Sequence, residues 1–378
     1  MLKFKHNGNY VNSFILGVEG KKMKKLALSA LILTMSLSVF TGCGSKAASG
    51  AGIAKMGMGH ITSIASSKDL GVDKDGKEVL PTGQVDTIIV AAAFDKDGKV
   101  VKVTIDNAQT KVDYNKDLSL KADIKAEGKT KVELGDNYGM IKASSIKKEW
   151  YQQIAELEKW MVGKTVEEIK GMKVVKKDDA HPSVPDVAEL KSSVTVSVEG
   201  YIAGLEEAYK NAIEVKGAEK IGLGHKISTA SSKALGTDKD GKEVLPTAQV
   251  DTVMATTAFD KDGKVVATVI DNAQTKVNFG KDGKVTSDKK EAPKTKVELG
   301  DGYGMIKASS IKKEWYQQIA ELQKYMAGKK VDEIKGMKVV KKDDAHPAVP
   351  DVAELKSSVT VSVQDYIAAV EEGAQKAK

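Results

Sequence analysis

The stretch TIIVAAAFDKDGKVVKVTID, residues 87–106, decides the fold of this chain. It contains two runs of β-branched and apolar residues, separated by a short polar segment with aspartate and glycine. This arrangement is typical of two antiparallel strands joined by a tight turn. The sequence therefore predicts a β-hairpin, which forms the basis of an antiparallel sheet.

The turn segment DKDGK, residues 95–99, also resembles half of a calcium-binding loop. Counting back five positions from Gly98 places Ala93 at the first ligand position of an EF-hand. Thr104 then falls at the twelfth position, where an acid is required. An EF-hand is excluded, and we interpret the segment as a hydrated turn.

Two helical patterns follow the hairpin. Ser145 is a candidate cap for the first helix, Gly163 is its stop, and Thr165 with Glu168 form a capping box for a short second helix. We interpret the aromatic and methionine stripe of the first helix as core, the alternative being a surface that stacks on a cofactor. The apolar residues at helical spacing are Ile146, Trp150, Ile154, Leu157 and Met161.

A last amphipathic helix completes the pattern. Its apolar face comprises Val198, Tyr201, Ile202, Leu205 and Tyr209. A hairpin-based antiparallel sheet with two main helices is an α+β arrangement.

The whole arrangement occurs twice. Repeat 1 spans residues 55–213 and repeat 2 spans residues 220–378, at a constant offset of 165 residues. Units of this size can each bury a core, so the pattern predicts two tandem domains instead of a solenoid of short repeats. The matched pairs that define the offset include His60 with His225, Trp150 with Trp315, and His181 with His346.

The N-terminal residues have the pattern of an export signal. Residues 1–42 form a predicted signal peptide that ends in a lipobox, and Cys43 is the expected lipidation site. An uncleaved membrane anchor is the alternative. Met23, followed by two lysines, fits a natural start better than Met1, so we hypothesise that residues 1–22 are an over-extended reading frame. Residues 43–54 are the predicted lipidated tether, which places the protein on the extracytoplasmic face of the cell membrane.

Composition excludes several classes of function. Residues 1–42 carry a net charge of +5 out of the total of +7, so the rest of the chain is nearly neutral. All 59 basic residues are lysine, and no guanidinium is present to grip phosphates or base edges. We therefore predict no nucleic-acid partner. The single cysteine is assigned to lipid, which excludes disulfides and cysteine metal sites.

No known catalytic motif pairs a nucleophile with a base, and the segments GMGH and GLGH are too short to be a dinucleotide fingerprint. We therefore expect an electron carrier or a binding protein more than a catalytic enzyme. His181 and His346 follow aspartate pairs in proline-rich loops, where a divalent metal could bind. A polar surface loop explains the same residues without a metal.

The segment KSSVTVS, residues 191–197, is rich in hydroxyls and recurs at residues 356–362. It lies where a proline-rich loop becomes the last helix. Hydroxyls at such a place are expected to cap the helix, and free N–H groups there bind anions.

The order of hairpin, glycine turn ELGDNYGM, aromatic helix and hydroxyl segment resembles the FMN-binding domain family of surface lipoproteins and redox-complex subunits. In that family a threonine in an Asp…Ser-Gly-Ala-Thr signature accepts FMN phosphate. The resemblance places Thr195 and Thr360 at the acceptor position. It also implies cofactor contacts from Lys191, Ser192, Ser193, Ser197, Tyr138, Gly139 and Met140, and from Lys356, Ser357, Ser358, Ser362, Tyr303, Gly304 and Met305.

This chain departs from the signature at two positions. Ser193 stands at the signature glycine and Val194 at the alanine. Both are bulkier where the attaching enzyme needs close access to the backbone, and valine resists a sharp turn. This departure argues against covalent attachment of the flavin.

Two hypotheses about function follow. The first is a lipid-anchored protein with two FMN-binding-like domains that carries electrons to a redox partner at the cell envelope. The second is a non-enzymatic surface lipoprotein that has lost the flavin site and binds a small ligand, a metal or an envelope partner.

Overall fold

The computed structural model describes residues 52–378. The predicted signal peptide, the alternative start at Met23, Cys43 and nearly all of the tether lie outside the described residues and stay predictions. Within residues 52–378, no helix is long and apolar enough to cross a membrane.

The described residues confirm the α+β class, and both repeats contain the same elements in the same order, except that β8 at the end of repeat 1 has no counterpart in repeat 2. Repeat 1 contains β1 (Lys55–Ser63), β2 (Gly71–Val72), β3 (Glu78–Val79), β4 (Thr82–Phe94), β5 (Val100–Asp113), α1 (Lys131–Leu134), α2 (Trp150–Met161), α3 (Val166–Lys170), β6 (Val174–Val175), β7 (Val184–Pro185), α4 (Glu199–Lys210) and β8 (Ile213–Glu214). Repeat 2 contains β9 (Lys220–Ser228), β10 (Gly236–Thr237), β11 (Glu243–Val244), β12 (Thr247–Phe259), β13 (Val265–Asn278), α5 (Lys296–Leu299), α6 (Trp315–Met326), α7 (Val331–Lys335), β14 (Val339–Val340), β15 (Val349–Pro350) and α8 (Gln364–Gln375). Short 3-10 turns, Gly135–Tyr138 and Met140–Lys142 with their counterparts Gly300–Tyr303 and Met305–Lys307, precede α2 and α6.

The predicted hairpin is confirmed. β4 and β5 pair antiparallel from Thr82 opposite Asp113 to a bulge at Phe94, and the sheet has the order β5-β4-β1-β8. In the turn, the carboxylate of Asp95 accepts the N–H groups of Asp97 and Lys99, so the aspartate closes the turn itself. Repeat 2 forms the sheet β13-β12-β9 in the same way.

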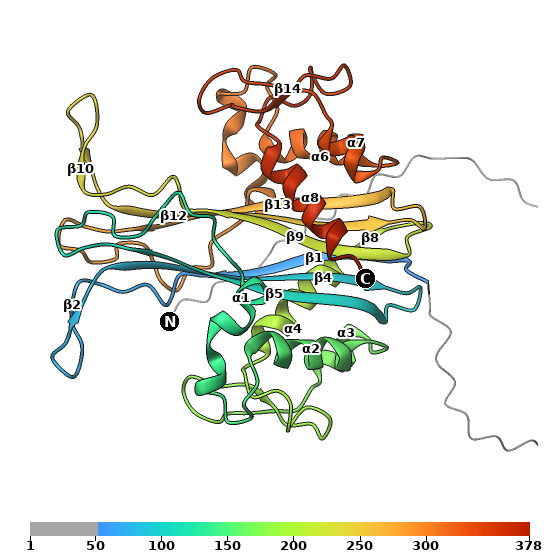
Figure 1. The fold of residues 1–378 in the computed structure, drawn as a ribbon, viewed down its shortest axis with the longest axis horizontal. Helices are drawn as coiled ribbons and strands as arrows, with labels where there is room; N and C mark the ends of the chain where they lie inside the picture. Colours follow the sequence, from blue (N-terminus) through green and yellow to red (C-terminus); the bar gives the residue numbers. More distant parts are fainter. Residues whose placement is uncertain (1–51) are drawn as a thin grey trace, which may run out of the picture. The chain divides into compact units, whose positions relative to one another are not determined.

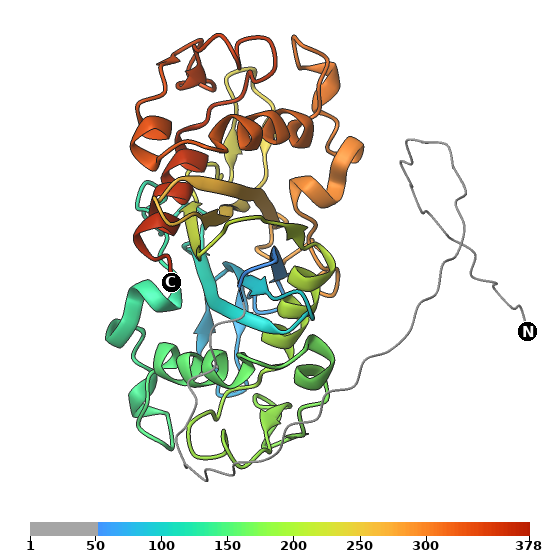
Figure 2. The ribbon, with the colours of Figure 1, turned by 90° about the vertical axis from the view of Figure 1, so that its right-hand side faces the viewer.

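The two sheets lie face to face, with helices on their outer sides. Figure 1 shows α2, α3 and α4 on one side of the sheets and α6, α7 and α8 on the other, and Figure 2 shows the same layers from the side. Along β4, Val90, Ala92 and Phe94 pack on the helices of their own repeat. Ile89, Ala91 and Ala93 pack instead on residues of repeat 2.

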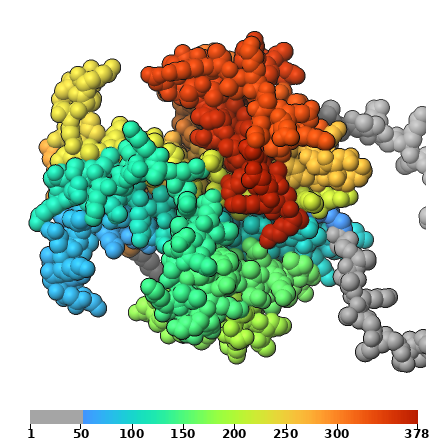
Figure 3. All heavy atoms as spheres, in the orientation of Figure 1, coloured from blue at the N-terminus to red at the C-terminus, as the bar shows by residue number. Residues whose placement is uncertain are grey.

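Each repeat thus has its own helix–sheet core, and a further core lies between the repeats. The inter-repeat core includes Met56 and Met58 from repeat 1 and Ile221, Leu223 and Met254 from repeat 2. A separate cluster between the repeats contains the rings of Tyr114 and Phe279, whose centroids lie 5.3 Å apart. Figure 3 shows the two halves of the chain in close contact. Burial of each large apolar side chain stabilises by about 2 kcal/mol, so the repeats stabilise each other.

Glycines in β1 and β9 let helices approach these strands closely. A Cβ on Gly57 would lie 1.8 Å from the carbonyl oxygen of Ala208 in α4. A Cβ on Gly222 would lie 1.8 Å from the carbonyl oxygen of Gly373 in α8. The GMGH and GLGH segments therefore serve helix packing, which their sequence alone did not reveal.

The helix boundaries confirm part of the prediction and correct another part. Thr165 accepts the N–H of Glu168 in a capping box, as predicted, and α2 ends just before Gly163. The predicted cap Ser145 is wrong, because α2 begins at Trp150 behind a buried Glu149 whose carboxylate accepts from Met140 and Ile141. Ile146 therefore lies outside the helix.

Candidate functional site

The hydroxyl-rich segment does not cap the last helix. α4 begins at Glu199, and its cap residue Val198 makes no side-chain hydrogen bond. Ser193 Oγ donates to the carbonyl of Leu190 at 3.3 Å, and Ser197 Oγ accepts the N–H of Ser183 at 3.3 Å. The predicted capping role is wrong, because the hydroxyls fasten turns that precede the helix.

Thr195, which the resemblance places at a flavin-acceptor position, is hydrogen-bonded to Gln153 of α2. Its N–H and its Oγ1 lie 2.8 and 3.2 Å from Oε1 of Gln153, whose side chain is fully buried. Thr360 makes the same two bonds to Gln318. In both repeats the acceptor hydroxyl is therefore already a hydrogen-bond donor to a buried amide.

The two lysines suggested for phosphate binding already have partners. Lys191 Nζ lies 2.7 Å from a carboxylate oxygen of Asp186, and Lys356 lies 2.8 Å from Asp351. Hydrogen bonds from Lys356 and Lys338 lower the pKa of Asp351 to about 2. These ion pairs fix Asp186 and Asp351 next to the two lysines.

The glycine turn lies over the outer face of each sheet. Gly139 has a φ of 77°, a left-handed conformation that favours glycine. The hydroxyl oxygen of Tyr138 in this turn lies 3.3 Å from Oε1 of Gln109. The ammonium of Lys131 lies 4.9 Å from the centroid of the Tyr138 ring. In repeat 2, Tyr303, Gln274 and Lys296 form the same arrangement.

A cavity of about 750 Å³ lies on the outer side of the repeat 2 sheet. It extends between β12, β13, the glycine turn and the loop that leads into α8, and a loop of repeat 1 closes one end. The cavity brings together part of the predicted site, namely Tyr303, Met305, Ser362 and His346. The other predicted residues of repeat 2 are not among its lining residues; they are Gly304, Lys356, Ser357, Ser358 and Thr360.

The inner wall of the cavity is aromatic and holds a buried lysine. Trp315 donates its indole N–H to the hydroxyl of Tyr366 at 2.9 Å. The Lys296 ammonium lies 5.3 Å from the Trp315 ring centroid, and burial lowers its pKa although Asp251 and Asp271 act in the opposite direction.

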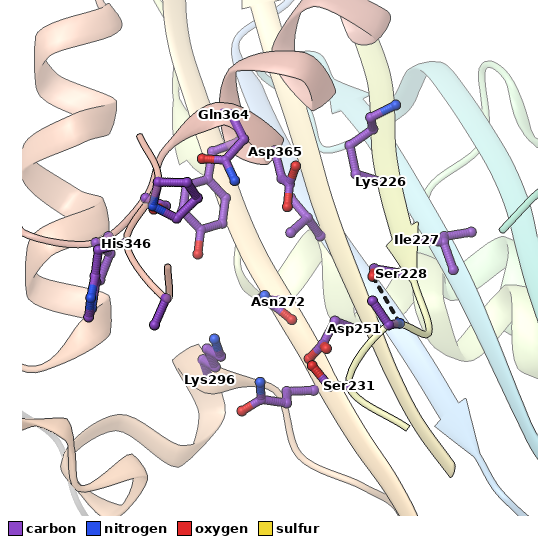
Figure 4. A pocket seen from close by; sticks show the side chains of 18 of the residues that line it. Lys226, Ile227, Ser228, Ser231, Asp251, Asn272, Lys296, His346, Gln364 and Asp365 are labelled. Atoms are coloured by element: carbon purple, nitrogen blue, oxygen red, sulfur yellow. Dashed lines mark hydrogen bonds between the residues drawn. The ribbon is translucent and has the colours of Figure 1, made fainter. Parts of the chain in front are cut away.

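One polar atom of this wall lacks a partner. The amide oxygen of Asn272 is buried and accepts no hydrogen bond within the described residues, and the same holds for Asn107 at the matching position of repeat 1. A buried acceptor without a donor is costly, so the position favours a ligand or water that donates a proton. Figure 4 shows Asn272, Lys296 and Asp251 around the open space, with His346 on the opposite side.

Charged residues surround the other end of the cavity. Lys226 forms an ion pair with Glu127 from the repeat 1 loop. Asp365 stands close by, and partial burial raises its pKa while Lys226 lowers it. This end therefore carries charges of both signs, with one of them supplied by the other repeat.

Most positions of the cavity wall are identical in repeat 1, but positions at the charged end differ. Gly200 replaces Asp365, Ile61 replaces Lys226 and Ile88 replaces Val253. A Cβ on Gly200 would lie 2.6 Å from Cδ1 of Ile88, so the isoleucine takes the space next to the helix start. Repeat 1 is thus apolar where repeat 2 is charged.

The proline-rich loops do not gather metal ligands. His181 Nδ1 lies 2.7 Å from Asp178, and His346 Nδ1 lies 2.8 Å from Asp343. Both histidines are exposed, and neither belongs to a group of three ligand-type side chains within residues 52–378. The weak metal candidates of the sequence analysis therefore have one acidic neighbour each.

Sequence reasoning missed most of the cavity wall. Asn272 and Gln274 line the cavity and belong to the segment IDNAQTKV, which occurs unchanged in both repeats and carries adjacent polar groups on a predicted strand. Lys296 follows in KTKVEL, which is also shared. Polar residues kept on a buried strand were the signal that could have located the site.

Comparison with known proteins gives limited information. No family model matches the chain, and no solved structure matches it. A stretch of 93 residues is 40% identical to the chlorophenol reductase of Desulfitobacterium hafniense. The stretch covers 21% of this chain and 28% of that protein, so the chain spans little more than a quarter of this relative's length.

Proposed function

We propose that this protein is a lipid-anchored, extracytoplasmic electron carrier that binds FMN noncovalently in the cavity of repeat 2. The observation that carries the proposal is the aromatic wall beside a buried, unpartnered amide oxygen. A cavity of about 750 Å³ is within the size range of small-molecule and cofactor sites.

The donors and acceptors of the wall suit a flavin. A flavin ring is planar and carries one ring N–H between two carbonyl groups. Asn272 Oδ1 would accept from such an N–H, and Lys296 would donate to a carbonyl. Trp315, Tyr303 and Met305 offer apolar surface to the ring.

A covalent link does not fit. Thr360 is bound to Gln318 and does not line the cavity, and Thr195 is bound to Gln153 in the same way. Forming a phosphoester would require the threonine to leave a buried amide. The residues therefore favour a flavin held by contacts alone.

When bound, a flavin supplies one- and two-electron transfer, and the protein sets its potential. Lys296 would favour negative charge at the ring, since a nearby cation stabilises an anion. The surrounding apolar side chains would exclude water from the ring. The similarity to a protein named a reductase hints at a cofactor and supports a redox role.

Binding of FMN to the purified full chain tests the proposal. Titration followed by quenching of flavin fluorescence should saturate, and acid denaturation should release all of the bound flavin. A protein that takes up no added FMN would overturn the proposal, and flavin that stays attached in acid would overturn the noncovalent mode.

Matched variants in the two repeats locate the site. Lys296→Met should weaken FMN binding at least about tenfold, because it removes a charged donor worth roughly 1.5–3 kcal/mol. Lys131→Met makes the same change in repeat 1 and should alter affinity less than about twofold. Equal losses would contradict the assignment to repeat 2.

The proposed location of the protein rests only on the predicted signal peptide and Cys43. Cys43→Ala should move the protein from the membrane fraction to the soluble fraction, because it removes the expected lipid. Retention in the membrane would favour an uncleaved anchor. A redox partner at the cell envelope is part of the same proposal.

The second candidate is a non-enzymatic surface protein that binds another small ligand in the same cavity. The engagement of both acceptor threonines by buried glutamines favours this candidate, because a lost flavin site would leave them free to take a structural role. Saturable binding of FMN that Lys296→Met weakens would favour the first candidate over the second.

A further inference from the structure

Two clusters of histidine and carboxylates lie where the repeats meet. The first gathers His225 and Glu372 from repeat 2 with Asp106 and Glu133 from repeat 1. The second gathers His60 and Glu207 from repeat 1 with Glu298 from repeat 2. The clusters are related by the offset of 165 residues, so the arrangement occurs twice.

The His225 cluster contains a buried nitrogen without a partner. The side chain of His225 is only 3% exposed, and its Nε2 makes no hydrogen bond within the described residues. Three carboxylates nevertheless surround this nitrogen. Its distances are 3.5 Å to Glu372 Oε1, 3.7 Å to Asp106 Oδ2 and 3.9 Å to Glu133 Oε2.

These distances suit a shared ion better than direct contacts. A protonated imidazole would donate to a carboxylate at about 2.8 Å, which is much shorter. Ligands at about 2.1 Å from a tetrahedral metal lie roughly 3.4 Å from one another. The spacing around His225 is close to that separation, and in the His60 cluster Nε2 lies 3.6 Å from both Glu207 and Glu298.

Backbone groups orient the carboxylates. Asp106 Oδ1 accepts the N–H groups of Asn107 and Val132, which leaves Oδ2 directed at His225. Glu372 Oε2 accepts the N–H of His225 itself at 2.7 Å, while Oε1 faces the imidazole. Fixed ligands of this kind are typical of sites in which outer contacts position the first shell.

A hollow borders the cluster. It has a volume of about 480 Å³, and Glu133, Glu372 and Lys376 are among its lining residues. Lys376 pairs with Glu372 Oε1, but it is more than one-third exposed and can turn into solvent. An ion could therefore reach the site and take the place of the ammonium group.

We propose that each cluster binds a divalent transition-metal ion that joins the two repeats. The His225 cluster offers one imidazole and three carboxylates, and the His60 cluster offers one imidazole and two carboxylates. Both sets suit Zn²⁺, Mn²⁺ or Fe²⁺, and a ligand set without thiolates argues against soft ions. The ligands come from both repeats, so the ion links β9 and α8 of one repeat to β5 and α1 of the other.

Cobalt binding to the metal-free full chain tests this inference. Two Co²⁺ per chain should bind, with the visible absorption that tetrahedral cobalt shows. Glu372→Gln and, independently, Glu133→Gln should each weaken one of the two sites at least about tenfold. Glu207→Gln should weaken the other, and combining it with Glu372→Gln should remove both.

A neighbouring residue provides the control. Glu371→Gln changes a partly exposed carboxylate on the same helix, which pairs with Lys335 and lies outside the cluster. It should leave both sites intact, and far-UV circular dichroism should show that every variant is folded. Binding of no cobalt, or equal loss with Glu371→Gln and Glu372→Gln, would overturn the inference.

Discussion

The helix–sheet cores of the two repeats are built from largely the same side chains, whereas other parts of the repeats differ. The two cores share identical side chains at most large positions. Most of the cavity wall is also identical, and it differs mainly at its charged end. The identical core residues of repeat 1 include Trp150, Ile154, Leu157, Met161, Ile169, Leu190, Val194, Val198 and Tyr201.

One pair of positions shows what the packing requires. Glu158 Oε1 accepts the N–H of Ile105 in repeat 1, and Gln323 Oε1 accepts that of Ile270 in repeat 2, both at 2.7 Å. An acceptor of this shape is needed in both repeats, whereas a negative charge is not. The two repeats therefore keep the hydrogen bond at this position but differ in the charge of the side chain that accepts it.

The largest effect is expected where strand and helix touch. Gly57→Ala and Gly222→Ala would each place a methyl group 1.8 Å from a helix carbonyl oxygen, so the helix must move away. Each change should lower the free energy of unfolding by about 3 kcal/mol. Urea denaturation of the full chain measures the loss in both repeats.

An open glycine provides the control for these variants. A methyl group on Gly236 would meet no other atom within 4 Å, so Gly236→Ala should change stability by less than about 0.5 kcal/mol. If Gly57→Ala were as mild as Gly236→Ala, the close strand–helix contact would not exist in solution.

A smaller effect should distinguish Glu158 from Gln323. Burial raises the pKa of Glu158 above its ordinary value of 4.5, although Lys378 acts in the opposite direction. A raised folded-state pKa means that the folded protein binds the proton more tightly, so its stability falls as pH rises through that pKa. Glu158→Gln should therefore stabilise the protein by about 1 kcal/mol at pH 7 and confer no advantage below the ordinary pKa.

The reverse change in repeat 2 sharpens this test. Gln323→Glu should lower stability at pH 7 and have little effect in acid, as measured by thermal unfolding across pH. A stabilising Gln323→Glu at neutral pH would show that this site favours the charged form.

The smallest effect should come from a helix cap. Thr165 caps α3 through its hydroxyl, but Lys330 occupies the matching position before α7. Thr165→Ala should cost about 1 kcal/mol, and Lys330→Thr should gain up to about as much. Chemical denaturation measures both, and a neutral Lys330→Thr would mean that α7 gains nothing from a hydroxyl cap.

The sequence predicted the local structure well. The hairpin at residues 87–106 and the capping box at Thr165 follow from turn and cap chemistry that is contained in a few neighbouring residues. Ser145 misled the prediction because a glutamate, Glu149, caps α2 while its carboxylate also holds the glycine turn. A cap residue whose side chain also binds a turn eight or nine residues upstream cannot be recognised from cap preferences alone.

The contact between the repeats was harder to predict. The run IIVAAAF in β4 is apolar on both faces, which indicates a strand covered on both sides. It does not indicate whether a helix or a second sheet provides the cover. Three residues of the predicted site, Tyr303, Met305 and Ser362, line the cavity. The cavity residues Asn272 and Lys296 were not predicted from the sequence and were identified from the structure.

The inter-repeat contact has an isologous form. His60 faces Glu298 of the other repeat, and His225 faces Glu133, the residue that corresponds to Glu298. Reciprocal contacts of this kind are the mark of a two-fold symmetric dimer. A single-repeat ancestor would have exposed the same apolar sheet face, so the tandem chain has the form of a homodimer fused into one gene, free to let its halves diverge.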